Sequence, residues 1–415
     1  MTLLTQLALS VCLQSGGAPG GAGSSAMLTP APPNHRDASV INPQGPLKRA
    51  NGRLNRFTMS VTIFQPPLKT PSGPWTLPLI VEGPWSTVDP SQFEISLSTA
   101  NGRISSAAAD MVTSPTPLGN AMLEADVPQI NAYPVTFAVQ GVVATWSSVF
   151  DDAAGLRLDW PAQWPAAVQS QLRPSLLIES DSDIITSTVT RVTQGDVRSV
   201  PPLQAAKLLV QFTCDNFQPN GPRMLRGMQR QLRGIAVAGA ESAAESGTGS
   251  RADLVCLCVA MLRAAGLPAR PVIGIAPDQG KERGEFSVWA EVFLPQCGWV
   301  PFDPYELKKR SVQTFDARQA WRYFGNVPDL DRHIPLSWSF APGNGATAWD
   351  AWALWGWARL APGAEFPLTL DHRMINTDDG PLTLQDANVV PSQVNLQRSS
   401  LGLSQPPINV SPQQP

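Results

Sequence analysis

One stretch of the sequence, residues 250–265, specifies a helix together with both of its ends. Ser250 is a favourable N-cap residue, and Asp253 follows three positions later, as in a capping box. Gly266 and Pro268 stop the helix after its last turn. Apolar side chains recur at helical spacing in between: Leu254, Leu257, Cys258, Met261 and Leu262. We therefore expect a core helix around which the remaining chain packs.

The length and the charge of the chain narrow the range of functions. The 415 residues suffice for two or three domains, and 30 Lys and Arg residues nearly balance 33 Asp and Glu residues. A formal net charge of −3 argues against a nucleic-acid partner, because proteins that bind nucleic acids usually carry a basic patch or a high pI. The slightly acidic balance instead favours a protein or peptide partner. The oligomeric state stays open.

The five cysteines predict neither a disulfide framework nor a metal site. They are scattered, and Cys256 and Cys258 lie two residues apart on one predicted helix, so they point to different faces. No Cys or His cluster has the spacing of metal ligands, and we expect no metal and no other cofactor.

The predicted localisation depends on residues 1–12. No apolar run approaches the roughly 18 residues of a membrane-spanning helix. Residues 3–12 are apolar like the core of a signal peptide, but no Lys or Arg precedes residue 36. The pattern slightly favours a cytoplasmic protein, and export and cleavage of the first 25 residues remain open.

Composition shifts divide the chain into five predicted segments. Residues 1–50 form a disordered leader rich in Gly, Ser, Ala and Pro, and residues 388–415 form a disordered tail. Residues 51–165 carry short alternating strands separated by turns, which predicts a β-sandwich-like domain. The other two segments are the domain of the predicted helix, residues 166–345, and a Trp-rich β extension, residues 346–387.

Two motifs around the predicted helix resemble the transglutaminase-like superfamily. Gly249-Ser250-Arg251-Ala252-Asp253 resembles a family pattern Gly-x-Cys-x-Asp except that Arg251 stands in the cysteine position, and Leu262–Arg270 resembles the following run "LRAxGIPAR". Ser287–Pro304 matches "HAWAEVYLPGxGWVPFDP" without a gap. Residues 174–181 also resemble the segment that leads into many bacterial members.

The resemblance implies an α+β papain-like core, with helices packed on an antiparallel sheet. Active members carry out acyl transfer or amide hydrolysis on glutamine or peptide substrates, with a Cys–His–Asp triad. In this chain the nucleophile position holds Arg251, the histidine position holds Ser287, and Asp303 occupies the third position. Losing the thiol removes the nucleophile and losing the imidazole removes the base. We therefore favour an inactive, transglutaminase-like binding or scaffolding protein.

An active enzyme with a rearranged site is the alternative. Cys256 or Cys258 would then be a relocated nucleophile, although both lie more than a helical turn into the helix. The histidines are His35, His333 and His372, of which His333 lies closest to the motifs. The sequence therefore does not decide whether any enzymatic activity survives, although we favour a protein without activity.

The charge of Arg251 suggests a hypothesis about the altered site. A cation in the first turn of a helix is disfavoured by about 0.3–1 kcal/mol, so a compensating contact is expected. We expect Arg251 to fill the volume of the missing imidazole and to pair with Asp303, with Asp253 and Glu291 as rival partners.

Two further patterns flank this domain. A helix is predicted over Pro222–Leu232; it carries Arg223, Arg226 and Arg230, and Arg233 lies just past its end. Arg226, Arg230 and Arg233 share a face, which is an anion or partner site or a solvated basic face, and we favour the latter. The tryptophans of residues 338–357 cover a sheet face or line a ligand groove, and we favour the former. They are Trp338, Trp349, Trp352, Trp355 and Trp357.

Overall fold

The computed structural model describes twelve stretches of the chain, all within one unit, residues 34–415. These stretches are 41–42, 44–63, 75–78, 83–88, 94–99, 102–105, 111–115, 121–125, 135–226, 232–277, 284–340 and 368–376. The statements below concern these residues. Residues 1–40 and 43 of the predicted leader, with His35 among them, lie outside these stretches, as do the predicted tail and the tryptophans at 349, 352, 355 and 357.

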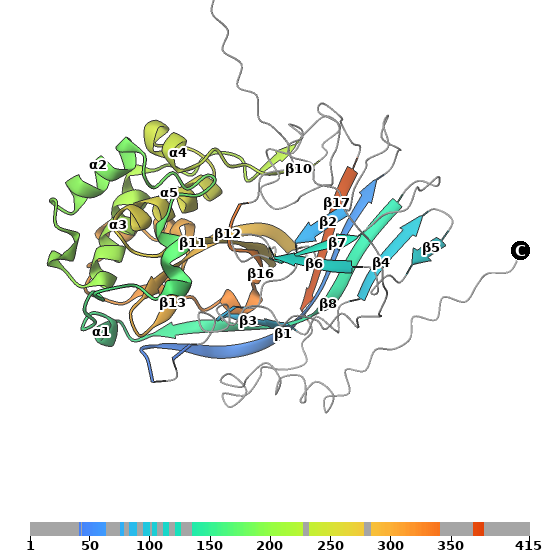
Figure 1. The fold of residues 1–415 in the computed structure, drawn as a ribbon, viewed down its shortest axis with the longest axis horizontal. Helices are drawn as coiled ribbons and strands as arrows, with labels where there is room; N and C mark the ends of the chain where they lie inside the picture. Colours follow the sequence, from blue (N-terminus) through green and yellow to red (C-terminus); the bar gives the residue numbers. More distant parts are fainter. Residues whose placement is uncertain are drawn as a thin grey trace, which may run out of the picture. The chain divides into compact units, whose positions relative to one another are not determined.

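The α-helices of the described residues follow the N-terminal strands in the sequence (Figure 1). They are α1 (Asp152–Gly155), α2 (Asp183–Val192), α3 (Pro202–Asn216), α4 (Ala240–Ser246), α5 (Arg251–Ala264) and α6 (Pro304–Lys309). The predicted helix is α5, and its residues from Ala252 to Arg263 are all buried. It contacts each of α2, α3, α4 and α6, so it is the centre of the helical layer.

A four-stranded antiparallel sheet, in the order β13-β12-β11-β16, packs against α5. Its strands are β11 (Ala269–Pro277), β12 (Gly284–Leu294), β13 (Gly298–Phe302) and β16 (Ile334–Ser337). Ala290, Val292 and Leu294 alternate along β12 and have no exposed surface, which is the pattern of a strand with a buried face. Helices on an antiparallel sheet give the α+β, papain-like core that the sequence predicts.

Two further sheets are built mainly from the N-terminal part of the chain. One has the order β17-β1-β8-β4-β5, with β3 paired to β8, and the other has the order β2-β7-β6. Their strands are β1 (Leu47–Ile63), β2 (Trp75–Pro78), β3 (Ser86–Val88), β4 (Glu94–Thr99), β5 (Gly102–Ser105), β6 (Met111–Pro115), β7 (Ala121–Ala125), β8 (Val135–Phe150) and β17 (Leu368–Asn376).

These sheets fit the β-rich pattern of residues 51–165, whereas the sandwich itself and the domain boundaries stay predictions. Two details differ from the expected segments. β1 begins at Leu47, inside the last residues of the predicted leader. β17 comes from the predicted Trp-rich extension and pairs antiparallel with β1 over residues 55–63.

The helix predicted over Pro222–Leu232 is wrong. The chain forms the antiparallel strands β9 (Met224–Arg226) and β10 (Leu232–Ile235) there, with Ile235 opposite Met224. Gly227 lowers helix stability by about 1 kcal/mol, and strand pairing prevails over the weak helical period. Arg226 and Arg233 therefore lie in paired strands and not on one helix, and Arg230 lies outside the described residues.

A short parallel pair, β14 (Trp321–Arg322) and β15 (Gly325–Asn326), joins the core to the end of β8. The side chain of Asn326 accepts a hydrogen bond from the Phe150 backbone N–H at 2.8 Å. Gly325 has φ +72°, and a Cβ at this position would lie 2.7 Å from the Cβ of Phe150. Both the backbone angle and the close approach require glycine here.

Candidate functional site

The start of α5 is fixed by a complete capping box. The Ser250 hydroxyl accepts from the Asp253 N–H at 3.1 Å, and the Asp253 carboxylate accepts from the Ser250 N–H at 2.8 Å. The second oxygen of Asp253 accepts from the N–H groups of Ala238 and Gly239, at 2.6 and 3.1 Å. The position of Arg251 is therefore set by a rigid helix end.

The side chain of Arg251 is directed at Tyr305 in α6. Its guanidinium carbon lies 3.5 Å from the centroid of the Tyr305 ring, and one Nη donates to the phenol oxygen at 2.8 Å. Both side chains are half-buried. A guanidinium stacked on an aromatic ring combines a cation–π contact with dispersion, and the hydrogen bond fixes its rotation.

Asp303 serves as the N-cap of α6. Its carboxylate accepts from the N–H groups of Tyr305 and Glu306, at 2.9 and 3.1 Å. Burial raises the pKa of Asp303 to about 6, against the lowering effect of the hydrogen bond from Glu306 and of the nearby His333. The Asp303 carboxyl group therefore stabilises the start of α6, in addition to occupying a position of the family motif.

The predicted ion pair between Arg251 and Asp303 is wrong. In the described part of the chain Arg251 pairs with Tyr305, and no ion pair joins it to a carboxylate. The rival partners are also engaged elsewhere: Asp253 caps α5, and Glu291 pairs with Arg270 at 2.6 Å. The sequence contains a signal for this contact, because Tyr305 follows Asp303 by only two residues and an aromatic ring is a good partner for a guanidinium.

Ser287 lies in β12 opposite Gly274 of β11 and is half-buried. Among the residues described, no hydrogen bond links Ser287 to Arg251 or to Asp303. The three positions of the family motif are thus placed by α5, β12 and the start of α6 without direct polar contact. This arrangement contains neither a thiol nor an imidazole.

The cysteines of the described residues are all buried and free: Cys214, Cys256, Cys258 and Cys297. Burial raises the pKa of Cys256 and of Cys258 well above the usual value, and the negative charge of Asp253 adds to the effect at Cys256. Burial also raises the pKa of Cys297 to about 12. Such thiols are not ionised near neutral pH and make poor nucleophiles.

The described histidine closest to the motif positions is His333. Its Nδ1 lies 2.8 Å from the carbonyl oxygen of Asp329, and its ring stacks edge-on against Trp289 at 5.2 Å. It lines a small pocket with Trp85, Trp289 and Trp338. His372 is in β17, opposite Met59 of β1. No hydrogen bond joins His333 to a cysteine within the described ranges.

The described residues contain no group of three or more His, Cys, Asp or Glu side chains that could hold a metal ion. None of their helices has the length and apolar character needed to cross a membrane.

Comparisons with known proteins place the domain in a family. Residues 188–304 match the model of the transglutaminase-like superfamily. No curated protein matches the sequence. A solved structure of a proposed cysteine protease from Cytophaga hutchinsonii aligns with a TM-score of 0.50 at 14% identity, over 81% of this chain and 96% of that one.

A second solved structure, the periplasmic domain of TgpA from Pseudomonas aeruginosa, aligns with a TM-score of 0.29 at 15% identity. It covers 62% of this chain and 90% of the other. The family model spans both α5 and the β12–β13 hairpin, where the sequence motifs lie. Residues 188–304 of this chain are therefore a domain of the transglutaminase-like superfamily, on a papain-like α+β core.

Proposed function

We propose that the protein is a catalytically inactive transglutaminase-like protein that binds a protein or peptide partner. The observation that carries the proposal is Arg251 at the position of the family's nucleophile, where its guanidinium stacks on Tyr305 at 3.5 Å. A guanidinium stays protonated and cannot attack an acyl carbon. The thiol and the imidazole of the family triad are both replaced, so the retained fold would bind a protein or peptide partner without reacting with it.

The state of the cysteines supports this proposal over a rearranged cysteine enzyme. Cys256 and Cys258 have no exposed surface, and burial raises the pKa of both thiols. A nucleophilic cysteine needs the opposite: access to substrate and a lowered pKa. The five-segment domain plan is part of the same proposal, with the β-rich residues 51–165 as a non-catalytic unit.

The proposal is tested by labelling the native protein with iodoacetamide and mapping the labelled cysteines by mass spectrometry. We expect Cys256 and Cys258 to remain unlabelled until the protein is unfolded in guanidinium chloride. Incorporation of a fluorescent amine into a glutamine-rich protein substrate should equal the background. Saturable labelling of native Cys256 or Cys258, lost when that cysteine is changed to Ala, would overturn the proposal.

A matched pair of variants shows whether the altered position itself accounts for the missing reactivity. Arg251→Cys places a thiol at the N-terminus of α5, where the helix dipole lowers its pKa. We expect this variant to be labelled at residue 251 in the native state, whereas Arg251→Ser is not. If the new thiol is also inert, access to the site, and not the residue type, limits its chemistry.

A further inference from the structure

We propose that Arg251 is a receptor for a carboxylate group of the bound peptide, at the position where the family has its nucleophile. The inference rests on the proposed binding function and names the chemical group that this site recognises. Two features of the Arg251 guanidinium support it: the ring of Tyr305 holds the group in place, and several of its N–H groups have no acceptor among the described residues.

The guanidinium of Arg251 is held from one side. Its plane rests on the Tyr305 ring and one Nη donates to the phenol oxygen at 2.8 Å. Across the described residues, Nε and the other Nη have no acceptor. The side chain has therefore lost much of its rotational freedom before any ligand arrives, which lowers the entropic cost of binding.

Arg270 shows what a complete arginine site looks like in the same domain. Its guanidinium is stacked between Trp299 and Trp338, at 4.0 and 3.8 Å, and it also pairs with Glu291 at 2.6 Å. Arg251 has the stacking ring but no carboxylate. A peptide carboxylate would complete at Arg251 the arrangement that Glu291 completes at Arg270.

The cations next to Tyr305 differ in whether they have an acidic partner. Lys309 lies 5.5 Å from the Tyr305 ring, but it pairs with Glu306 at 2.7 Å, and Arg310 also approaches Glu306, at 3.6 Å. Arg251 is thus the cation at Tyr305 without an acidic partner in the described structure. A carboxylate matches the planar N–H fork of arginine and would supply that partner.

The test uses NMR titration of the full chain with three small probes. N-acetylglycine supplies a C-terminal carboxylate, N-acetylglutamic acid α-amide supplies a side-chain carboxylate, and N-acetylglycinamide is the neutral control. Binding is followed on the backbone amides of Ala252 and Tyr305. We expect saturable shifts with one or both carboxylates, whose difference identifies the source, and none with the neutral probe.

Variants tie the shifts to Arg251. Arg251→Gln should weaken carboxylate binding at least tenfold, as expected for a charge-assisted hydrogen bond of about 1.5–3 kcal/mol. Arg198→Gln is the matched control, because Arg198 is exposed and stacks on Trp160 at 5.3 Å. Its loss should leave the affinity unchanged. Should Arg251→Gln fail to fold, Tyr305→Leu removes the support of the guanidinium and should weaken binding in the same direction.

The inference is overturned by an absence of saturable shifts, by equal loss in Arg198→Gln, or by sulfate binding as tightly as the carboxylates, which would mean an adventitious ion only. These outcomes leave the proposed function intact as long as the native cysteines stay unlabelled by iodoacetamide. Labelling of native Cys256 or Cys258 would instead overturn the proposed function, whatever the probes show.

Discussion

The buried charges of Arg270 and Glu291 stabilise each other across two neighbouring strands. Arg270 and Glu291 are direct cross-strand neighbours in β11 and β12, and both are almost fully buried. Burial alone lowers the pKa of Arg270 and raises that of Glu291, and each charge opposes the shift of the other. Each charge therefore offsets part of the cost of burying the other.

Removing one member of this pair should be costly. Glu291→Gln leaves the Arg270 charge buried without compensation, and we expect a loss of about 3–5 kcal/mol in the free energy of unfolding. Urea denaturation monitored by circular dichroism measures it. Lys309→Gln, which breaks a pair whose lysine side chain is 54% exposed, is the control and should change stability by less than about 1 kcal/mol. Similar losses of unfolding free energy in Glu291→Gln and Lys309→Gln would show that the burial of an ion pair does not determine the cost of breaking it.

The pKa of Asp303 predicts a pH dependence with a definite sign. Burial raises it from 3.8 to about 6, so between these values the native state binds more protons than the unfolded state. Stability from this residue is therefore greatest below pH 4 and falls as the pH rises through 6, by at most about 3 kcal/mol. Asp303→Asn keeps an N-cap for α6 and removes the charge.

The measurement compares wild type and Asp303→Asn in urea from pH 4 to pH 8. We expect the variant to be as stable as wild type or more stable at pH 8, and the difference to shrink towards pH 4. Other groups with shifted pKa values, such as Glu291, contribute equally to the pH dependence of stability in both proteins, so their contribution cancels in the comparison. A variant that is less stable at pH 8 would show that the ionised cap outweighs the cost of burial.

The sequence predicts the motif positions of the site, but it does not predict their contacts. Two ungapped motifs assign Arg251, Ser287 and Asp303 to the catalytic positions of the family, and this assignment stays a prediction. The contact of Arg251 with Tyr305 depends on how α6 packs against α5. Charge alone favours Asp303, but that carboxylate already accepts two backbone N–H groups.

Among the elements, α5 is the one that local sequence determines most fully. Its cap, its apolar period and its glycine stop agree, and the helix forms where they predict it. The segment of β9 and β10 lacks such agreement. A run of arginines at helical spacing competes with Gly227 and with pairing to a second strand 232–235, which only the folded chain supplies. Elements with a single favourable signal are therefore the ones predicted wrongly.

The two cap residues of α5 should differ in their importance. Ser250→Ala removes one capping hydrogen bond and should cost about 1 kcal/mol. Asp253→Ala also frees the N–H groups of Ala238 and Gly239, so we expect a loss of about 2–4 kcal/mol. Urea titrations of both variants give the comparison. Equal losses would mean that the loop before α4 does not depend on Asp253.

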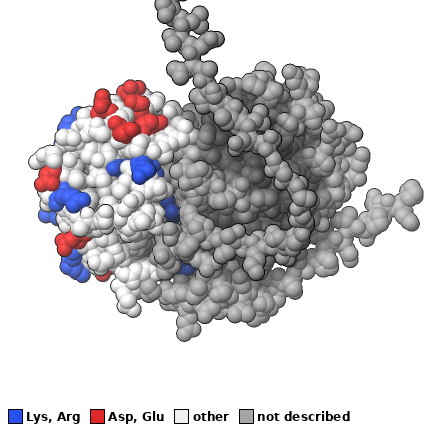
Figure 2. Space-filling model, in the orientation of Figure 1, with Lys and Arg blue, Asp and Glu red and all other residues white. Residues whose placement is uncertain are grey.

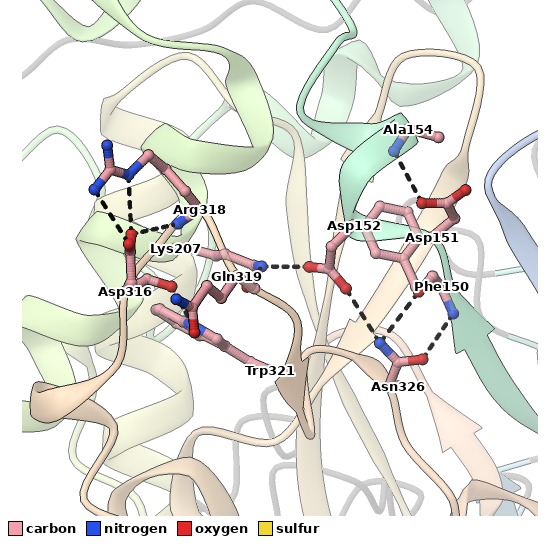
Figure 3. A network of polar contacts seen from close by, with 10 residues as sticks. All are labelled: Phe150, Asp151, Asp152, Ala154, Lys207, Asp316, Arg318, Gln319, Trp321 and Asn326. Atoms are coloured by element: carbon pink, nitrogen blue, oxygen red, sulfur yellow. Dashed lines mark hydrogen bonds and ion pairs between the residues drawn. The ribbon is translucent and has the colours of Figure 1, made fainter.

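At the scale of the whole molecule, one buried network joins segments that are far apart in the sequence (Figure 3). Lys207 of α3 has no exposed surface, and its ammonium group donates to the Asp152 carboxylate of α1 and to the Gln319 carbonyl oxygen at 2.7 Å. Asn326 of β15 donates to the other Asp152 oxygen at 3.3 Å. The aromatic rings of Trp321 and Phe324 lie beside the ammonium group.

Charges on the described face of the molecule follow a different pattern (Figure 2). The largest group of acidic side chains lies at the top of the view, and other acidic side chains are scattered among Lys and Arg. Glu241 and Glu245 of α4 and Asp181 and Asp183 at the start of α2 are exposed, and α2 contacts α4. These four acidic residues are thus solvated on the helices α2 and α4 or next to them, whereas Lys207 and Asp152, which join distant segments, are buried.

A double-mutant cycle on Lys207 and Asp152 tests whether the buried network connects these segments. Burial raises the pKa of Asp152 and lowers that of Lys207, so each charge depends on its partner. Lys207→Met and Asp152→Asn should each cost about 3–5 kcal/mol, because each leaves one charge unpaired. The double variant should cost less than the sum, with a coupling energy of about 1–3 kcal/mol from urea titrations. Additive losses would show that Lys207 and Asp152 stabilise their helices independently, and that packing of Trp321 and Phe324 holds β15 to the core.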